Sequence, residues 1–281
     1  MRIASLQPSI TLTLQSLGRL DSLCACTKYC LEFLPELAAR NLPILHDSWS
    51  FDKAGNIATL LAAKPDLVIA SVPYRMESLA AILKSGLPAL TLAPHSLADI
   101  ETDIRLIASV IDAAPQAEAL ITHFRQALAD ARAVAAASTK PIVYCEEWGK
   151  PLIHSQHWVA ELVDAAGGTF LGTPGSHTTP ETIASLPESD QPDILLFAWC
   201  GAGNRVPLER VIAQRNWHHL PAVRHRRVFC VPDELFNTPA PTLLDGLACI
   251  ASVLHPTLYA PHPRLISVGE HLSNNLSPQV C

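Results

Sequence analysis

The chain has 281 residues, of which 49% are hydrophobic and 16% are charged. That much apolar sequence can bury one large core or two cores of roughly 100–150 residues each, and we expect two. The formal net charge is −6, and the longest cationic cluster is the short run Arg224 to Arg227. Because a phosphate backbone requires a basic stripe, we expect no nucleic-acid partner.

The first residues and the cysteines bear on cellular location. Met1 to Leu6 already has the pattern of a strand, which leaves no room for a secretion signal. No uncharged run reaches the ~18–20 residues that span a bilayer. The eight cysteines of a chain this large are expected to be free thiols in a reducing compartment. These features predict a cytoplasmic protein that does not contact a membrane.

Apolar runs alternate with helical patterns along the first hundred residues. In chain order we expect a strand at 3–6, a helix near 11–17, a strand at 22–26, an apolar stretch at 31–39, a helix near 56–63, a strand at 66–70, a helix near 76–85 and a strand at 89–92. This alternation predicts a parallel sheet that helices cover on both faces.

A long helical pattern follows this first region. Ser96 has the features of an N-cap and Asp99 completes a capping box. Isoleucines then recur at helical spacing, and Pro115 begins a further helical segment that reaches about Ala137. A helical connection of this length exceeds a usual crossover between neighbouring strands, so it is expected to join two lobes.

The alternation restarts after residue 138. We expect strands at 142–145, 194–198 and 227–231 and helices at 158–166, 208–213 and 242–254. The predicted fold class is therefore α/β, with two Rossmann-like α/β/α lobes joined by a long helical connection and a ligand cleft between the lobes. The expected boundaries are 1–95 for the N-terminal lobe, 96–138 for the linking helix, 139–257 for the C-terminal lobe and 258–281 for an extended tail.

Ligands of open parallel sheets bind at the loops that follow the strands. Seven such segments are rich in aromatic and polar residues: 7–9, 24–30, 46–49, 71–76, 146–148, 199–203 and 233–237. Four of them contain Trp or Phe in a chain that is only 6% aromatic. This pattern favours a flat ligand that stacks between two walls, although the same aromatics could instead form an interlobe core.

Two other chemistries are open at this point. Cys24, Cys26 and Cys30, with Cys200 or His46, could bind zinc or ferrous iron, making the protein a direct metal carrier. Their spacing fits no standard zinc motif, and buried free thiols need no function.

The alternative of an enzyme on a binding-protein scaffold would use Glu147 or His154 as a base. Adjacent strand residues face opposite sides, so Glu146 and Glu147 should not share a proton; we expect one exposed and the other near the cleft. No Gly-x-Ser-x-Gly or His-Glu-x-x-His motif is present.

Several separated motifs resemble the substrate-binding proteins of cobalamin and siderophore uptake systems, whose two lobes are joined by one long helix. The segments 3–9 and 64–69 are similar to that family's opening strand and to its signature before a later strand. Similarity to leaderless bacterial proteins labelled cobalamin-binding extends over 93–97, 147–152, 158–163, 165–168, 200–201, 236–241 and 244–247.

The resemblance implies a binding protein without catalytic residues, whose small-molecule ligand is a corrinoid such as cobalamin or another metal chelate. Trp49 aligns with a ligand-stacking tryptophan of the cobalamin binders, and Cys26 or Cys200 could lie near the ligand's metal. The predicted ligand-binding residues are Ser9, Cys26, Tyr29, Trp49, Glu147, Trp148, Trp199, Cys200, Phe236 and Asn237.

The chain also departs from the family pattern. Periplasmic relatives dock onto their membrane permease through a glutamate on each lobe, and Ala58 and Asn237 occupy those positions here, with Glu234 nearby. Permease docking is therefore doubtful. Leaderless relatives often have Ser-His-Glu-Cys-Asp-Tyr-Pro where this chain has 24–30, and only Tyr29 is shared.

Overall fold

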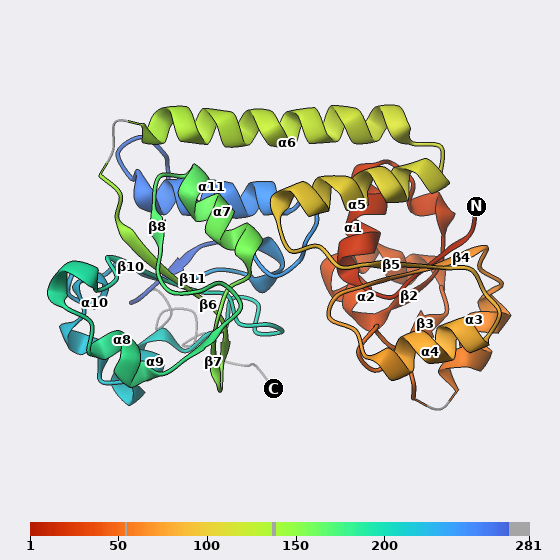
Figure 1. The fold of residues 1–281 in the computed structure, drawn as a ribbon, viewed down its shortest axis with the longest axis horizontal. Helices are drawn as coiled ribbons and strands as arrows, with labels where there is room; N and C mark the ends of the chain where they lie inside the picture. The colour runs from red at the N-terminus through yellow and green to blue at the C-terminus, as the bar shows by residue number, and fades with distance from the viewer. Residues whose placement is uncertain (54, 137–138, 270–281) are drawn as a thin grey trace, which may run out of the picture. The chain divides into compact units, whose positions relative to one another are not determined.

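A computed structural model describes residues 1–53, 55–136 and 139–269. The chain divides into two compact units. Unit 1 contains Met1–Phe124 and the short segment Pro239–Pro241, and unit 2 contains Arg125–Thr238 and the chain from Thr242 onward. Both units are of the α/β type, which confirms the predicted fold class (Figure 1).

Unit 1 is built on a five-stranded parallel sheet in the order β3-β2-β1-β4-β5. Its strands are β1 (Ile3–Ser5), β2 (Leu23–Thr27), β3 (Ile44–Leu45), β4 (Leu67–Ser71) and β5 (Ala89–Leu92). Its helices are α1 (Pro8–Ser16), α2 (Lys28–Phe33), α3 (Asn56–Ala63), α4 (Met76–Lys84) and α5 (Leu97–Val110), with 3-10 turns at Leu20–Ser22 and Pro35–Arg40. Figure 1 shows α1 and α5 on one face of the sheet and α3 and α4 on the other.

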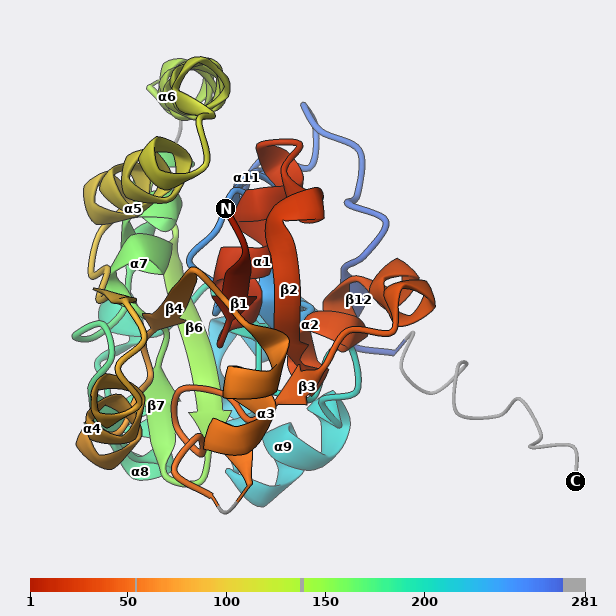
Figure 2. The ribbon, with the colours of Figure 1, turned by 90° about the vertical axis from the view of Figure 1, so that its right-hand side faces the viewer.

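The order of strands reverses between β1 and β4, which lie side by side in Figure 2. A crevice forms at the carboxyl edge of a parallel sheet where the chain turns in opposite directions from two neighbouring strands. In unit 1 this point lies beyond Ser5 and Ser71, the last residues of the two strands. The strands themselves are apolar and buried, and Leu6, Val68 and Phe51 are members of one core cluster.

The predicted linking helix consists of two helices, α5 and α6 (Ala114–Ala135). Ser96 and Asp99 form the expected capping box at the start of α5. The break follows Val110, where Asp112 adopts φ of 53°, a left-handed conformation that an α-helix does not contain. Pro115 then lies in the first turn of α6, where its missing N–H leaves no helical bond unmade. Residues 137 and 138 of the predicted segment lie outside the described residues.

Unit 2 has a mixed sheet in the order β12-β11-β10-β6-β7-β9, and β8 pairs with β6. Its strands are β6 (Ile142–Gly149), β7 (Leu152–His154), β8 (Thr169–Phe170), β9 (His177–Thr178), β10 (Ile194–Phe197), β11 (Val228–Cys230) and β12 (Ile266–Ser267). Its helices are α7 (His157–Ala165), α8 (Pro180–Ala184), α9 (Leu208–Gln214), α10 (Pro221–Arg224) and α11 (Leu243–Leu254), with 3-10 turns at Glu188–Asp190, Trp217–His219 and Asp233–Leu235.

The parallel strands β6, β10 and β11 form the centre of this sheet, as the sequence predicted. The antiparallel strands β7, β9 and β12 were not predicted, because each has only two or three residues. β12 lies within the segment expected to be an extended tail, and residues 270–281 of that segment are outside the described residues. No helix of the described chain has the length and apolar character needed to cross a bilayer.

The cap of α5 gives a direct test of how sequence sets this helix boundary. The Ser96 hydroxyl accepts from the Asp99 N–H at 3.1 Å, and Asp99 Oδ2 accepts from the Ser96 N–H at 2.9 Å. Ser96→Ala should lower the free energy of unfolding by about 1 kcal/mol, measured by urea titration. The control Ser109→Ala changes an exposed serine near the end of the same helix and should stay within about 0.5 kcal/mol of wild type. Equal losses in both variants would contradict the capping role.

Candidate ligand-binding site

In unit 1, the loop of residues 46–50 is bonded to the backbone at the switch point of the sheet. The Ser48 N–H donates to the carbonyl of Leu6, directly after β1, at 3.2 Å. The Ser48 carbonyl accepts from the Arg75 N–H, in the segment after β4, at 3.3 Å. The buried side chain of Asn56 secures the other end of the loop through the His46 N–H and the Phe51 carbonyl. The loop is therefore attached to the segments that follow both strands of the switch point.

Trp49 lies on this loop and its side chain is 55% exposed. The backbone on either side of the indole is ordered by Asp47, whose Oδ1 accepts from the Trp49 and Ser50 N–H groups at 3.0 and 2.8 Å. The guanidinium of Arg75 lies 5.8 Å from the centre of the tryptophan ring, within range of a cation–π interaction. A large, mostly apolar side chain is thus open to solvent at the edge of the sheet where open α/β folds commonly bind ligands.

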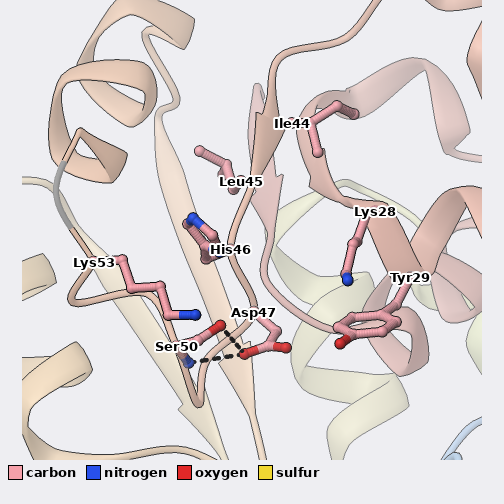
Figure 3. Close-up of a pocket in the computed structure, with 8 residues that line it drawn as sticks. All are labelled: Lys28, Tyr29, Ile44, Leu45, His46, Asp47, Ser50 and Lys53. Atoms are coloured by element: carbon pink, nitrogen blue, oxygen red, sulfur yellow. Dashed lines mark hydrogen bonds between the residues drawn. The ribbon is translucent and has the colours of Figure 1, made fainter. Parts of the chain in front are cut away.

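A cavity of about 280 Å³ opens beside this loop (Figure 3). The side chains around it come from the start of α2, from β3 and from the loop that carries Trp49. They are Lys28, Tyr29, Ile44, Leu45, His46, Asp47, Ser50 and Lys53. The predicted ligand residue Tyr29 therefore belongs to a cavity next to Trp49, and the two cationic residues of its lining were not identified from the sequence.

The thiols of unit 1 are buried. The Cys26 thiol is hydrogen-bonded to the sulfur of Cys30, and the Thr11 and Thr27 hydroxyls lie 3.1 and 3.3 Å from that sulfur. The bond from Cys26, supported by both hydroxyls, lowers the pKa of Cys30 to about 6 despite its burial. Bonding to Cys30, together with burial, raises the pKa of Cys26. Cys24 is buried as well, and burial raises its pKa.

These positions bear on the predicted metal site and on the predicted contacts Ser9 and Cys26. The side chains of both residues are buried, with exposed fractions of 6% and 0%. Among the described residues, no group of three His, Cys, Asp or Glu side chains is placed to hold a metal ion. The candidates Cys24, Cys26 and Cys30 belong to unit 1 and Cys200 belongs to unit 2. The metal-carrier alternative therefore receives no support from the described residues.

In unit 2, two tryptophans border a second cavity, of about 320 Å³, at the carboxyl end of β10. Its lining is Trp148, Gly149, Lys150, Trp199, Cys200, Gly201 and Ala202. The side chain of Trp148 is 44% exposed, and its indole N–H donates to the Lys150 carbonyl at 2.8 Å. Trp199 lies against Gly149, where a Cβ would come within 2.5 Å of the indole ring. The absence of a side chain at Gly149 makes room for that ring.

A buried ion pair orients Trp199. Glu146 is fully buried and accepts two hydrogen bonds from Arg215, at 2.7 and 2.8 Å. The Trp199 indole N–H donates to the same carboxylate at 2.7 Å, and the Tyr144 hydroxyl donates to it as well. Arg215 lies 4.8 Å from the centre of the Trp217 ring. The expectation that one of the two adjacent glutamates is exposed was wrong. Glu146 is fully buried at the centre of this network, and Glu147 is half-buried.

Glu147 is half-buried, and its carboxylate accepts from the Gln156 amide at 2.7 Å. Burial raises the pKa of this carboxyl group, and the bond from Gln156 partly opposes the rise. The Glu147 carbonyl accepts from the Cys200 N–H at 3.1 Å, which extends the pairing between β6 and β10 beyond the strands. Cys200 is exposed in the cavity lining.

The remaining candidates of unit 2 are more enclosed. Phe236 is fully buried, and its carbonyl accepts from the Trp158 indole at 2.7 Å. Asn237 donates to the Ala198 carbonyl at 2.6 Å and to the Cys200 sulfur at 3.3 Å. His154 is 3% exposed, and burial lowers its pKa. Phe236 and His154 therefore expose almost no side-chain surface to a ligand or substrate.

Asp233 was not predicted as a site residue, although its side chain is hydrogen-bonded to the loop after β10. Its carboxylate accepts from the Gly201 and Gly203 N–H groups at 2.8 and 3.0 Å. Burial raises the pKa of Asp233, and these two bonds lower it in part. Both glycines have positive φ, at 74° and 56°, so the loop needs their conformational freedom. The pair of glycines was visible in the sequence, but their partner 30 residues later was not.

Two α/β units connected through helices are the architecture of two-lobed binding proteins. The chain belongs to the periplasmic binding protein family, whose pattern matches residues 3–235. The resemblance noted in the sequence is therefore confirmed, as is the prediction of a binding protein rather than an enzyme.

Individual proteins are similar to this chain at low identity. An uncharacterized ABC transporter substrate-binding lipoprotein of Bacillus subtilis (strain 168), YvrC, is 22% identical over 217 residues, which span 73% of this chain and 66% of that protein. The periplasmic vitamin B12 binding protein BtuF of Vibrio cholerae is similar in structure, with a TM-score of 0.70 and 23% identity over 92% of this chain and 97% of BtuF. A periplasmic heme binding protein from Pseudomonas aeruginosa has a TM-score of 0.79 and 20% identity, covering 95% and 97% of the two chains.

Removing one partner of the buried Glu146–Arg215 pair should strongly destabilise unit 2. Glu146→Gln leaves Arg215 buried without its counter-charge, so the free energy of unfolding should fall by about 3–5 kcal/mol. Loss of the charged acceptor of the Trp199 indole should also shift the tryptophan fluorescence of the folded protein.

Glu188→Gln is the matched control, since it removes the carboxylate of an exposed ion pair with Arg224 in the same unit. This variant should unfold within about 1 kcal/mol of wild type. If urea titration gave the same small loss for both variants, the structural role of Glu146 would be refuted.

Proposed function

We propose that the protein binds a flat metal chelate, of the corrinoid or related tetrapyrrole type, through the tryptophan-bearing edges of its units. The observation that carries the proposal is the exposure of Trp49 and Trp148, at 55% and 44%. Trp148 lines the cavity of unit 2, and the loop that carries Trp49 contributes His46, Asp47 and Ser50 to the lining of the cavity of unit 1. Tryptophan is normally among the more buried side chains, so two ordered and exposed indoles at ligand edges point to a stacking function.

The physical properties of the two surfaces agree with such a ligand. Both cavities contain aromatic side chains in their lining, and an aromatic side chain can contribute 150–250 Å² of contact area when covered. A planar macrocycle presents an apolar face of matching chemistry, while its peripheral groups and its metal remain available to polar side chains. Two of the similar structures are a vitamin B12 binding protein and a heme binding protein, which also favours this class of ligand.

Within this proposal the predicted residues take different parts. Tyr29 and Trp49 in unit 1, and Trp148, Trp199 and Cys200 in unit 2, supply exposed or half-buried surface for direct contact. Glu147 and Asn237 are the polar candidates for groups at the ligand's edge. Whether one ligand contacts both units remains a prediction from the sequence, which the variants below test.

The two positions at which the family carries docking glutamates have no carboxylate in this chain. Ala58 is exposed on α3 and carries no charge, and Asn237 donates its amide N–H to a backbone carbonyl and a sulfur. The neighbouring Glu234 is already ion-paired with Arg264. We therefore propose that the protein holds its ligand without engaging a permease at these positions.

We also propose that the protein works in the cytoplasm. The described chain contains seven cysteines, all of them free, and six of the seven are buried. Such thiols persist in a reducing compartment, whereas an oxidising one favours disulfides. Fractionation of the native host followed by immunoblotting should find the protein with cytoplasmic markers, and recovery in an extracytoplasmic fraction would refute the location.

The binding proposal is tested by removing one indole from each unit. Wild type should bind cobalamin, cobinamide or hemin with one ligand per chain, measured by calorimetry and by a shift of the visible bands. Trp49→Ala and Trp148→Ala should each weaken the bound chelate about tenfold or more, because each removes a central aromatic contact. Weakening by both variants would show that one ligand uses both units.

The matched controls remove exposed apolar side chains that line neither cavity. Leu83→Ala in unit 1 and Leu258→Ala in unit 2 change residues that are 67% and 65% exposed. Both should bind the chelate as wild type does. If wild type bound none of the three chelates, the proposed function would be abandoned.

A further inference from the structure

The cavity beside Trp49 carries an unbalanced charge. Lys28 and Lys53 contribute two positive charges to its lining, and Asp47 contributes the one negative charge. Neither lysine has an ion pair in the described part of the chain. The cavity therefore has a net positive charge even when His46 is neutral.

The single carboxylate of the cavity is occupied by its own loop. Asp47 Oδ1 accepts from the N–H groups of Trp49 and Ser50 and from the Ser50 hydroxyl, at 3.0, 2.8 and 2.9 Å. These bonds make Asp47 a structural element of the turn that presents the indole. No ion pair joins this carboxylate to Lys28 or Lys53 among the described residues.

The two ammonium groups reach the cavity from different elements. Lys28 is the first residue of α2, and its Nζ lies 4.8 Å from the centre of the Tyr29 ring. Lys53 follows the loop of residues 46–50. Figure 3 shows Lys53 extending inward from one side and Lys28 with Tyr29 from the other. Ile44 and Leu45 contribute apolar side chains to the wall of the cavity.

We propose that this cavity binds an anionic oxygen group of the ligand, a carboxylate or a phosphate, between Lys28 and Lys53. The inference rests on the proposed function and adds a ligand class to it: a chelate with an acidic peripheral group is preferred over its neutral counterpart. Ammonium groups are strong donors to both kinds of oxyanion, and the Tyr29 hydroxyl and His46 ring add uncharged donors to the same cavity. A free metal cation is disfavoured there by the same positive charges.

The strength of this contact is limited by exposure, since both lysine side chains are open to solvent. An exposed charge pair is worth no more than about 1 kcal/mol, which corresponds to about fivefold in affinity. Two such contacts should give about tenfold, should add to the association rate and should weaken as salt screens them. The cavity is thus expected to select among chelates rather than to provide most of the affinity.

The experiment compares chelates that differ in their acidic groups. Ferric protoporphyrin with free carboxylates is compared with its dimethyl ester, and cobalamin, which has a phosphodiester, is compared with cobinamide, which lacks it. Dissociation constants are measured by visible titration at low and high salt for wild type, for the double variant Lys28→Gln/Lys53→Gln and for Lys84→Gln. Lys84 is an exposed lysine of α4 that lies outside the cavity lining, so its variant controls for net charge.

Wild type and Lys84→Gln should prefer the member with the acidic group in one pair by about tenfold at low salt, and the double variant should lose this preference. The dimethyl ester and cobinamide, which lack the acidic group, should gain nothing from the two lysines and should bind the double variant at least as well as wild type. The pair that shows the effect identifies the oxyanion as a carboxylate or a phosphate. Equal preference in wild type and in the double variant would overturn the proposal while leaving chelate binding intact.

A second measurement covers the case in which wild type binds no chelate and the proposed function fails. Inorganic phosphate and citrate are then titrated into wild type and the double variant and followed by NMR of the backbone amides. Saturable shifts of residues around the cavity in wild type, absent from the double variant, would support the anion site by itself. Identical responses in the two proteins would refute it.

Discussion

Parallel strand pairing is the constraint on which both candidate surfaces depend. When neighbouring strands run in the same direction, the loops that follow them lie along one edge of the sheet. In unit 1 the pairing of β1 with β4 places the backbone after Ser5 beside the backbone after Ser71, and the loop bearing Trp49 is bonded to both. In unit 2 the pairing of β6 with β10 brings Trp148 and Trp199 to one cavity. The indoles are thus positioned by ladder register, while the loops determine only their orientation.

The orientation of Trp199 depends on a buried ion pair, Glu146 with Arg215. Burying Glu146 and Arg215 costs hydration free energy that a simple ion pair rarely recovers in full. Here the carboxylate accepts four bonds, from two guanidinium nitrogens, the Tyr144 hydroxyl and the Trp199 indole. An apolar replacement of the pair could keep the core packed, but it could not fix the direction of the indole N–H. The pair therefore contributes a defined ring position at the cavity more than it contributes net stability.

The sequence was informative wherever a local pattern repeated. The alternation of apolar runs with helices predicted the parallel strands, and Ser96 with Asp99 predicted the start of α5. Contacts between distant residues leave no such pattern. The residues around Glu146 do not indicate that its partner is Arg215, 69 residues away. Strands as short as β9 have too few residues to show a period. Phe236 was expected at the ligand surface because it follows a strand, but position along the chain does not determine how deeply a side chain is buried.

The cavity of unit 1 separates two kinds of recognition that a planar chelate requires. Stacking on an exposed indole is tolerant, because every macrocycle has an apolar face of similar area and polarity. Charge complementarity discriminates between chelates, because only a ligand with an acidic edge can pair with the two lysine ammonium groups. With any other ligand these groups stay hydrated. Trp49 and Lys53 are four residues apart in the chain, so one short segment contributes to both functions. A change of ligand preference would therefore need only substitutions at the lysines, without any change to the stacking surface or to the sheet beneath it.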